Sequence, residues 1–391
     1  MLDQTPTQPV DTHSPAATQP REYRFRFTGS GGEYFSIWIV NLLLSILTLG
    51  IYSAWAKVRR EQYFHRNTLL DNQPFDYTGQ PKKILIGRIL ALIVLAVGSS
   101  LQKINVPLAL AVTASFALLY PWIIVRSLKF RARNTRYRNL ALRFTGTTAE
   151  AVKVFLWIYV AVVPFVLVSI IYGPELAAIK AHKQAAAPNI SSGPMLWVFI
   201  SMGITALLFA VLWPIYQCRM QAFLHRHLRY GNAQGDFDGS TGDFYRALLR
   251  AAGVSVVTII LMGVIIAAMA ALKFPWGILL AYPLLLIPQA AYKVNIINTT
   301  YKHSSIGEQY FYADMKVGSY AWLLISNLVL LLVTLGFAWP WINVRLARYR
   351  CEHLALIATP AAIENVVGEA QQDISAFGEE AAEFLDFDIS L

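Results

Sequence analysis

The chain has 391 residues, of which 56% are hydrophobic and only 14% are charged, and its formal net charge is +10. A soluble protein carries about 25% charged residues, so the composition excludes an ordinary soluble protein and points to a lipid bilayer. The two cysteines, Cys218 and Cys351, are too few for a disulfide framework or a four-cysteine zinc site.

The chain divides into three regions. Residues 1–20 are rich in Pro, Thr and Gln and lack the apolar core of a signal peptide, so we expect a disordered tail. Residues 21–356 form a repeat-built membrane domain. Residues 357–391 contain many acidic residues and no Lys or Arg, which indicates a solvated acidic tail rather than a docking peptide.

Apolar runs account for most of the membrane domain. Most of them reach the ~20 residues that a helix needs to cross the hydrocarbon core, where the backbone must satisfy its own hydrogen bonds. We therefore predict an all-α polytopic membrane protein with about six to eight hydrophobic helical segments, short cytoplasmic β-strands and basic surface helices. In chain order the runs are 35–56, 84–101, 104–125, 152–172, 194–217, 247–272, 274–292 and 318–344.

The basic residues predict the orientation, because loops rich in Lys and Arg stay in the cytoplasm. If the first and last runs crossed the membrane fully, the arginines at 21–26 and 345–350 would lie outside. If both runs instead dip in and return, all basic residues face inward except Lys103, Lys180, Lys183 and Lys273. We favour six crossing helices with two dipping hairpins and both termini in the cytoplasm; full spans are the alternative.

The first and last runs each offer a place to turn. Asn41 begins N-L-L-L-S-I-L-T-L-G and Asn327 begins N-L-V-L-L-L-V-T-L-G. Gly50 and Gly336 end these matching phrases, and a glycine weakens a helix and permits a bend. Both hairpins are predicted to turn there.

An internal repeat extends this match along the chain. A tryptophan is followed four residues later by an arginine in three copies, at Trp55, Trp122 and Trp341. Ile215 and Arg219 hold the same places in another copy, and Gln289 and Lys293 in a weaker one. Agreement at several offsets indicates repeated structural units.

The phrase F-T-G-S-G-G-E at Phe27 recurs as F-T-G-T-T-A-E at Phe144 and, blurred, as F-D-G-S-T-G-D at Phe237. Alternating residues before it predict strands at 23–28, 74–78 and 140–145. The glycine is expected to permit the turn, and the Ser or Thr with an acid three residues later fits a helix capping box. A ligand-gripping role is the alternative to this structural interpretation.

The layout resembles the YjgN-like family of uncharacterised bacterial inner-membrane proteins. The most specific part is F-T-G-S-G-G-E-Y-F-S-I-W-I-V-N, Phe27 to Asn41, followed by T-L-G-I-Y-S-A-W-A-K-V-R, Thr48 to Arg59. The resemblance implies a multi-pass protein of the bacterial inner membrane. It implies no accepted activity and no catalytic residues.

The sequence offers no clear catalytic chemistry. Neither a nucleotide-binding fingerprint nor a nucleophile–base pairing is legible. His225 and His227 would face different sides of a helix, and no cysteine or carboxylate completes a ligand set, so we expect neither a metal nor another cofactor. We expect that the protein is not an enzyme.

A basic segment is the first candidate site, predicted to bind anionic lipid headgroups at about 1 kcal/mol per charge. The alternative is that these residues only orient the chain. Nucleic acid is not expected, because lipid already matches the charge, and the sequence identifies no protein partner. The residues are Arg126, Lys129, Arg131, Arg133, Arg136 and Arg138.

Asn41 and Asn327 are the second candidate, as polar residues in apolar runs. They are expected to form interhelical hydrogen bonds or to line a solute path. The leading functional hypothesis is transport or conduction of a small solute, because repeated hairpins commonly enclose a midplane site. The alternative is a membrane-organising or anionic-lipid-binding protein without transport activity.

Overall fold

The computed structural model describes residues 19–104, 106–181, 193–274 and 281–360. Almost all of the two predicted tails lies outside these ranges. The helical elements are α1 (Gly31–Leu47), α2 (Ser53–Arg66), α3 (Pro81–Gln102), α4 (Val106–Asn134), α5 (Thr148–Ala181), α6 (Gly193–Arg226), α7 (Thr241–Ala271), the 3-10 helix η2 (Tyr282–Leu285), α9 (Leu286–Lys302), α10 (Val317–Val333) and α11 (Trp339–Glu352).

Short strands join these helices. They are β1 (Arg21–Arg24), β2 (Arg26–Phe27), β3 (Thr68–Leu70), β4 (Gln73–Tyr77), β5 (Thr135–Tyr137), β6 (Leu140–Phe144), β7 (Leu228–Tyr230), β8 (Ala233–Phe237), β9 (Ser304–Ile306), β10 (Gln309–Ala313) and β11 (Leu354–Ala358). The strands predicted at 23–28, 74–78 and 140–145 are confirmed as β1 with β2, β4 and β6.

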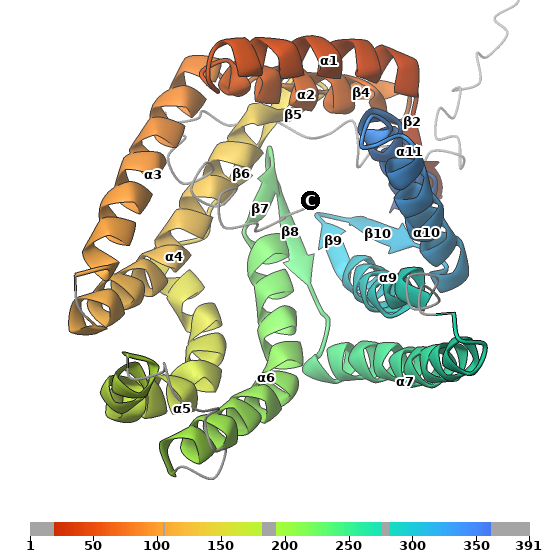
Figure 1. Cartoon of the computed structure of the whole chain (residues 1–391). Helices are drawn as coiled ribbons and strands as arrows, with labels where there is room; N and C mark the ends of the chain where they lie inside the picture. The colour runs from red at the N-terminus through yellow and green to blue at the C-terminus, as the bar shows by residue number, and fades with distance from the viewer. Residues whose placement is uncertain (1–18, 105, 182–192, 275–280, 361–391) are drawn as a thin grey trace, which may run out of the picture.

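The described strands form one 11-stranded antiparallel sheet in the order β1-β11-β10-β9-β8-β7-β6-β5-β4-β3-β2. A single residue, Phe25, separates β1, which pairs with β11, from β2, which pairs with β3. The two ends of the sheet therefore belong to one stretch of chain, and the sheet closes into a ring, here called the strand ring. In Figure 1 the helix pairs surround these strands.

The strand ring corrects the prediction of an all-α protein with isolated short strands. A three-residue strand such as Thr68–Leu70 carries too little sequence to show alternation, and it is stable here because strands from neighbouring repeats pair on both sides. The helical part of the prediction is confirmed, since helices make up most of the described chain and five of them are long and apolar.

Equivalent backbone hydrogen bonds confirm the repeat. In each unit the residue after a strand donates its N–H to the carbonyl of the residue that ends a helix in the next unit. Within the described residues the pairs are Thr28–Asn67 (2.9 Å), Thr78–Asn134 (2.9 Å), Thr145–His227 (2.9 Å), Asp238–His303 (3.1 Å) and Asp314–His353 (3.2 Å).

This register corrects the weakest copy of the repeat. His303 follows α9 just as His353 follows α11 and Asn67 follows α2. Counting back twelve and eight residues from His303 gives Ala291 and Asn295, not the predicted Gln289 and Lys293. Gln289 and Lys293 therefore lie two residues out of step with the other copies.

The recurring F-T-G phrase has the predicted structural role. Ser30 with Glu33, and Ser240 with Asp243, form complete capping boxes at the starts of α1 and α7. The glycine of the phrase is not required for the turn itself, because its backbone φ is not positive in any of the three copies. A Cβ on Gly146 would lie 2.6 Å from the ring of Phe144. The glycine therefore leaves room for the aromatic ring two residues before it.

The turns predicted at Gly50 and Gly336 are confirmed. Leu49 has φ 50° and Gly50 has φ 91°, and the Gly50 N–H donates to the Ser45 carbonyl at 2.7 Å. The bonds of Gly336 in the last hairpin follow the same pattern, at 2.8 Å. This is the Schellman arrangement, which satisfies the last carbonyls of a helix before the chain reverses.

Five of the described helices, α3 to α7, are long and apolar enough to cross a membrane. The first and last hairpins differ, because α1 and α10 have only 17 residues each. The Arg88 guanidinium in the first half of α3 donates to Ser53 at the tip of the α1/α2 hairpin, so this tip lies beside the first half of α3. The sixth predicted crossing, 274–292, falls partly on 275–280, outside the described residues.

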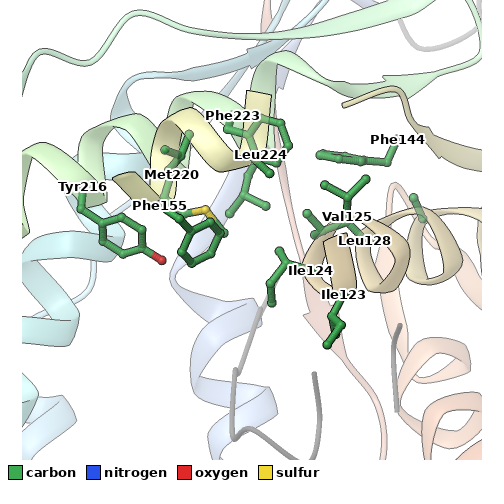
Figure 2. Packing of buried hydrophobic residues seen from close by; sticks show 13 residues of the cluster. Ile123, Ile124, Val125, Leu128, Phe144, Phe155, Tyr216, Met220, Phe223 and Leu224 are labelled. Atoms are coloured by element: carbon green, nitrogen blue, oxygen red, sulfur yellow. The ribbon is translucent and has the colours of Figure 1, made fainter. Parts of the chain in front are cut away.

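Buried hydrophobic residues form six clusters in the described chain, and two of them show how the hairpins and the ring are packed. One lies between α4, α5 and α6, where Phe144 packs near Val125 and Leu128 while Phe223 and Leu224 come from α6 (Figure 2). The other lies in the middle of the strand ring. It contains Leu70, Tyr137, Tyr230, Ile306, Leu356 and Ala358, contributed by different strand hairpins.

Candidate functional site: an arginine belt beside the strand ring

Arginines occupy equivalent positions on four of the helices that lead into the strand ring. Each lies seven or eight residues before its helix ends, which places it about 10 Å from the ring along the helix. We call these residues the arginine belt. They are Arg59 on α2, Arg126 on α4, Arg219 on α6 and Arg345 on α11.

Aromatic rings accompany three members of the arginine belt. The Arg59 guanidinium carbon lies 5.8 Å from the ring centre of Tyr52, and that of Arg126 lies 5.4 Å from Trp122. Arg219 lies 5.5 Å from the Trp157 ring. A cation over an aromatic face contributes about 0.5–1 kcal/mol at exposed sites, and both residue types favour the headgroup level of a membrane.

Arg345 is held differently. Its Nη1 donates to Asn327 Oδ1 at 2.8 Å, and its Nη2 donates to Ser326 Oγ at 3.0 Å. Both acceptors lie on α10, so this arginine ties the two helices of the last hairpin together. The guanidinium thus forms hydrogen bonds within the hairpin, to the side chains of α10.

The predicted basic segment 126–138 is not a single helical patch. Arg126, Lys129, Arg131 and Arg133 lie on the last turns of α4, whereas Arg136 lies on β5 and Arg138 in the turn that follows. Arg138 Nη2 lies 2.6 Å from Asp71 Oδ2, and its guanidinium stacks on Tyr137 at 5.6 Å. Arg138 therefore links two strand hairpins, and Arg136 is the exposed member of the set.

The two predicted asparagines are buried, with 7% of Asn41 and 5% of Asn327 exposed. Asn327 forms the interhelical contact with Arg345 described above. Asn41 Oδ1 and Asn327 Nδ2 are buried without a hydrogen-bond partner. The two asparagines stand at corresponding places in the first and last hairpins, but only the side-chain oxygen of Asn327 accepts a hydrogen bond from an arginine.

Hydrogen-bonded tyrosines fill the middle of the strand ring. Tyr137 Oη donates to the Leu70 carbonyl at 2.9 Å, and Tyr230 Oη donates to the Tyr137 carbonyl at 3.0 Å. Each bond joins one strand hairpin to the next. Burial raises the pKa of Tyr230 to about 12, so the hydroxyl is neutral at physiological pH and suits an apolar centre.

Two histidines that end helices pair with acids of the preceding unit. His227 Nε2 lies 3.3 Å from Glu150 Oε1, and His303 Nδ1 lies 2.8 Å from Asp238 Oδ1. Glu150 lies 77 residues before His227 along the chain, so the sequence alone does not indicate this pair. These pairs connect adjacent units of the ring.

Sequence reasoning placed Arg126 in a candidate site but left Arg59 and Arg219 outside it. The signal was present, because the repeat offsets align all three residues. The aromatic partners of Arg126 and Arg59 lie four and seven residues before them on the chain, whereas Trp157 reaches Arg219 from a different helix. Only the folded chain shows the latter contact.

Comparison with known proteins agrees with the resemblance. A protein from Salmonella typhimurium (strain LT2) named "Inner membrane protein YjgN" is 33% identical over 147 residues, 37% of this chain and 36% of that protein. One of the same name from Escherichia coli (strain K12) is 44% identical over 55 residues, 14% of each chain. The matched regions thus span about a third or less of these relatives. No solved structure matches.

The family described as "Bacterial protein of unknown function (DUF898)" matches residues 22–384. This range includes the whole strand ring except Arg21 and all of the described helices. Its relatives are named as inner membrane proteins, and the described helices are apolar enough for a bilayer. The chain therefore belongs to the DUF898 family and is an integral membrane protein.

Proposed function

We propose that this protein binds anionic phospholipids of the inner membrane and organises the bilayer around its strand ring, without transport activity and without catalysing a reaction. The arginine belt carries the proposal. Several hairpins place an arginine at the same distance from the ring, and Arg59, Arg126 and Arg219 lie beside aromatic rings. Each base near an anionic leaflet adds about 1 kcal/mol of attraction.

The same charges support an orientation. Every strand hairpin of the ring is flanked by basic residues, and loops rich in Lys and Arg remain in the cytoplasm. In the proposed topology the strand ring and both termini are cytoplasmic, and the α1/α2 and α10/α11 hairpins dip into the membrane and return. The belt then lies at the level of the inner-leaflet headgroups.

The centre of the ring favours lipid binding over conduction. Apolar side chains such as Leu70, Ile306 and Leu356 meet there, and the tyrosine hydroxyls beside them donate to backbone carbonyls. A solute path along that axis would need polar groups that face an opening. The feature that favours transport instead is the pair of buried polar atoms without a partner, Asn41 Oδ1 and Asn327 Nδ2.

The test is lipid retention during purification. Replacing Arg59, Arg126 and Arg219 of the arginine belt, together with the exposed Arg136, by Gln should release bound phosphatidylglycerol or cardiolipin, because four charges at about 1 kcal/mol each are removed. Arg138 stays, since it pairs with Asp71. Lipids extracted from the purified protein are quantified by mass spectrometry.

A matched control removes four charges that the sequence predicts to face the other side of the membrane, by replacing Lys103, Lys180, Lys183 and Lys273 with Gln. This variant should retain its anionic lipid. Equal retention by both variants would contradict the proposal and leave the arginines as an orientation signal. Topology is checked in parallel with reporter fusions. Solute uptake into proteoliposomes, lost on Asn41→Leu, would favour transport instead.

A further inference from the structure

A groove of about 510 Å³ lies between the two helices of the first hairpin. One face of α2 lines it with polar groups spaced three, four and seven residues apart, which is the spacing of a helical stripe. The facing turn of α1 contributes a hydroxyl and two apolar side chains. The residues are Arg59, Gln62, Tyr63 and Arg66 on α2, Asn67 at its C-terminal end, and Ser36, Ile37 and Val40 on α1. Its lining has two arginines and no carboxylate.

An apolar stripe continues from the groove toward the tip of the hairpin. Val40, Leu43 and Leu47 follow Ser36 at helical spacing, so they share one face of α1. Their exposed fractions rise along the stripe, from 44% to 53% to 77%. The groove thus carries polar and cationic groups at the end near the strand ring, and exposed apolar side chains continue from it toward the tip of the hairpin. This is the shape of a site for an amphiphile with an anionic head.

The last hairpin shows why the groove is open in the first. In α10/α11 the Arg345 guanidinium donates to both Ser326 and Asn327 and bridges the two helices. Val40 stands at the place of Ser326 and has no oxygen to accept a hydrogen bond. Asn41 Oδ1 is left without a partner.

Arg59 is therefore not tied to α1 and lines the groove instead. Its neighbour Arg66 is engaged, with Nε donating to Asp76 Oδ1 at 2.9 Å. Gln62 Nε2 donates one hydrogen to the Tyr77 carbonyl at 3.4 Å, so its second N–H and the Arg59 guanidinium, one turn away, are the groups left to receive a phosphate. A guanidinium and an amide N–H₂ both donate, and charge-assisted bonds from arginine to phosphate are among the strongest in proteins.

We propose that this groove binds one anionic phospholipid per chain, with its phosphate on Arg59 and Gln62 and an acyl chain along Val40, Leu43 and Leu47. The site deepens the proposed function and rests on it, because it names one specific lipid position within a protein that binds anionic lipid generally. The apolar stripe excludes a free phosphate as the main ligand, since it adds nothing to the binding of a water-soluble ion.

The experiment measures lipid binding to the purified full chain in detergent by native mass spectrometry, with phosphatidylglycerol and phosphatidylethanolamine as probes. Arg59→Gln should bind the first phosphatidylglycerol about tenfold more weakly, which is the size of a lost charge-assisted hydrogen bond. The control is Arg60→Gln, because Arg60 has the same charge but pairs with Glu61 at 2.9 Å and does not line the groove. This control should bind as the wild type does.

A second variant keeps the charge. Val40→Ser supplies the acceptor that Ser326 supplies in the last hairpin, so Arg59 should turn onto α1 and binding should weaken although the net charge is unchanged. A folded variant is recognised by its unchanged thermal transition. If Arg59→Gln and Arg60→Gln bind phosphatidylglycerol equally, or if Val40→Ser binds as wild type, the groove site is wrong.

The failure of the broader proposal looks different. If the wild type shows no preference for phosphatidylglycerol over phosphatidylethanolamine, both the proposed function and the groove site fail. If the wild type shows the preference and Arg59→Gln keeps the first lipid, only the groove site fails. Free glycerol phosphate as a competitor separates headgroup binding from lipid binding, and displacement at equal concentration would contradict the role of the apolar stripe.

Discussion

Gly31, at the start of α1, lies directly against the indole of Trp341 on α11. A Cβ placed on Gly31 would be 2.1 Å from Trp341 Cδ1, a distance at which one group must move. Phe35, one turn further on, packs against the same indole in a tilted arrangement with ring centroids 4.9 Å apart. The first and last hairpins thus meet in a tight seam, which closes the helices into a circle as β11 closes the strands.

The seam makes Gly31 sensitive to any side chain. Gly31→Val should lower the free energy of unfolding by about 1–3 kcal/mol, the usual cost of overpacking a filled site. Gly32→Val is the matched control, because a Cβ on Gly32 meets nothing within 4 Å. Thermal unfolding in detergent measures both. Similar transition temperatures for the two variants would show that the seam is not tight.

Local signals in the sequence predicted the parts of the fold that depend on neighbouring residues. The Ser30–Glu33 capping box, the turn at Gly50 and the strands that end in F-T-G are each written within a few residues. The five apolar runs between 84 and 272 likewise marked α3 to α7, because hydrophobicity over ~20 residues is a strong signal.

The remaining features depend on contacts between repeats. Strands such as β3 and β9 have three residues each and gain their partners from the neighbouring units, so nothing local marks them. The closure of the ring joins Tyr23 to Leu356 across the whole chain. At the candidate site, Arg345 donates to Ser326 on the facing helix, whereas Arg59 faces Val40, which has no side-chain acceptor. The repeat pattern aligns the two arginines and so does not indicate that their contacts differ.

The strand ring should depend on its last strand. Ending the chain after His353 removes β11, which pairs with both β1 and β10 and places Leu356 in the centre of the ring. Loss of a buried leucine alone costs about 2–5 kcal/mol, and the unpaired strand edges add to this. Limited trypsin digestion should then cut at Arg21, Arg24 and Arg26. A chain ending after Pro360 keeps β11 and should resist; equal digestion of both would exclude a closed ring.

The buried hydroxyl of Tyr230 should make the free energy of unfolding fall at alkaline pH. Burial raises its pKa from 10.0 to about 12, so its contribution to stability is full below pH 10. It is lost as the pH rises toward 12, because the unfolded chain ionises first. Tyr230→Phe should lose about 1 kcal/mol at neutral pH with the hydrogen bond to Tyr137, and should lose less further stability from pH 10 to 12 than the wild type. Urea unfolding at several pH values measures this, and parallel curves would contradict it.

The hairpin tips distinguish dipping from full crossing. A helix of 17 residues such as α1 is about 26 Å long, shorter than the ~30 Å hydrocarbon core, and the Arg88 contact places the tip of α1/α2 beside the first half of α3. Leu49 and Leu335 are 95% and 88% exposed at these tips.

In a chain with Cys218→Ala and Cys351→Ala, we expect Leu49→Cys and Leu335→Cys to resist a membrane-impermeant maleimide added to intact cells. Lys183→Cys should react from outside, and Asn139→Cys, in a turn of the strand ring, should react only after the cells are opened. Labelling of Leu49→Cys and Leu335→Cys in intact cells would show that the tips of the first and last hairpins reach the far surface, and would contradict the dipping hairpins, whose two ends both remain at the strand ring.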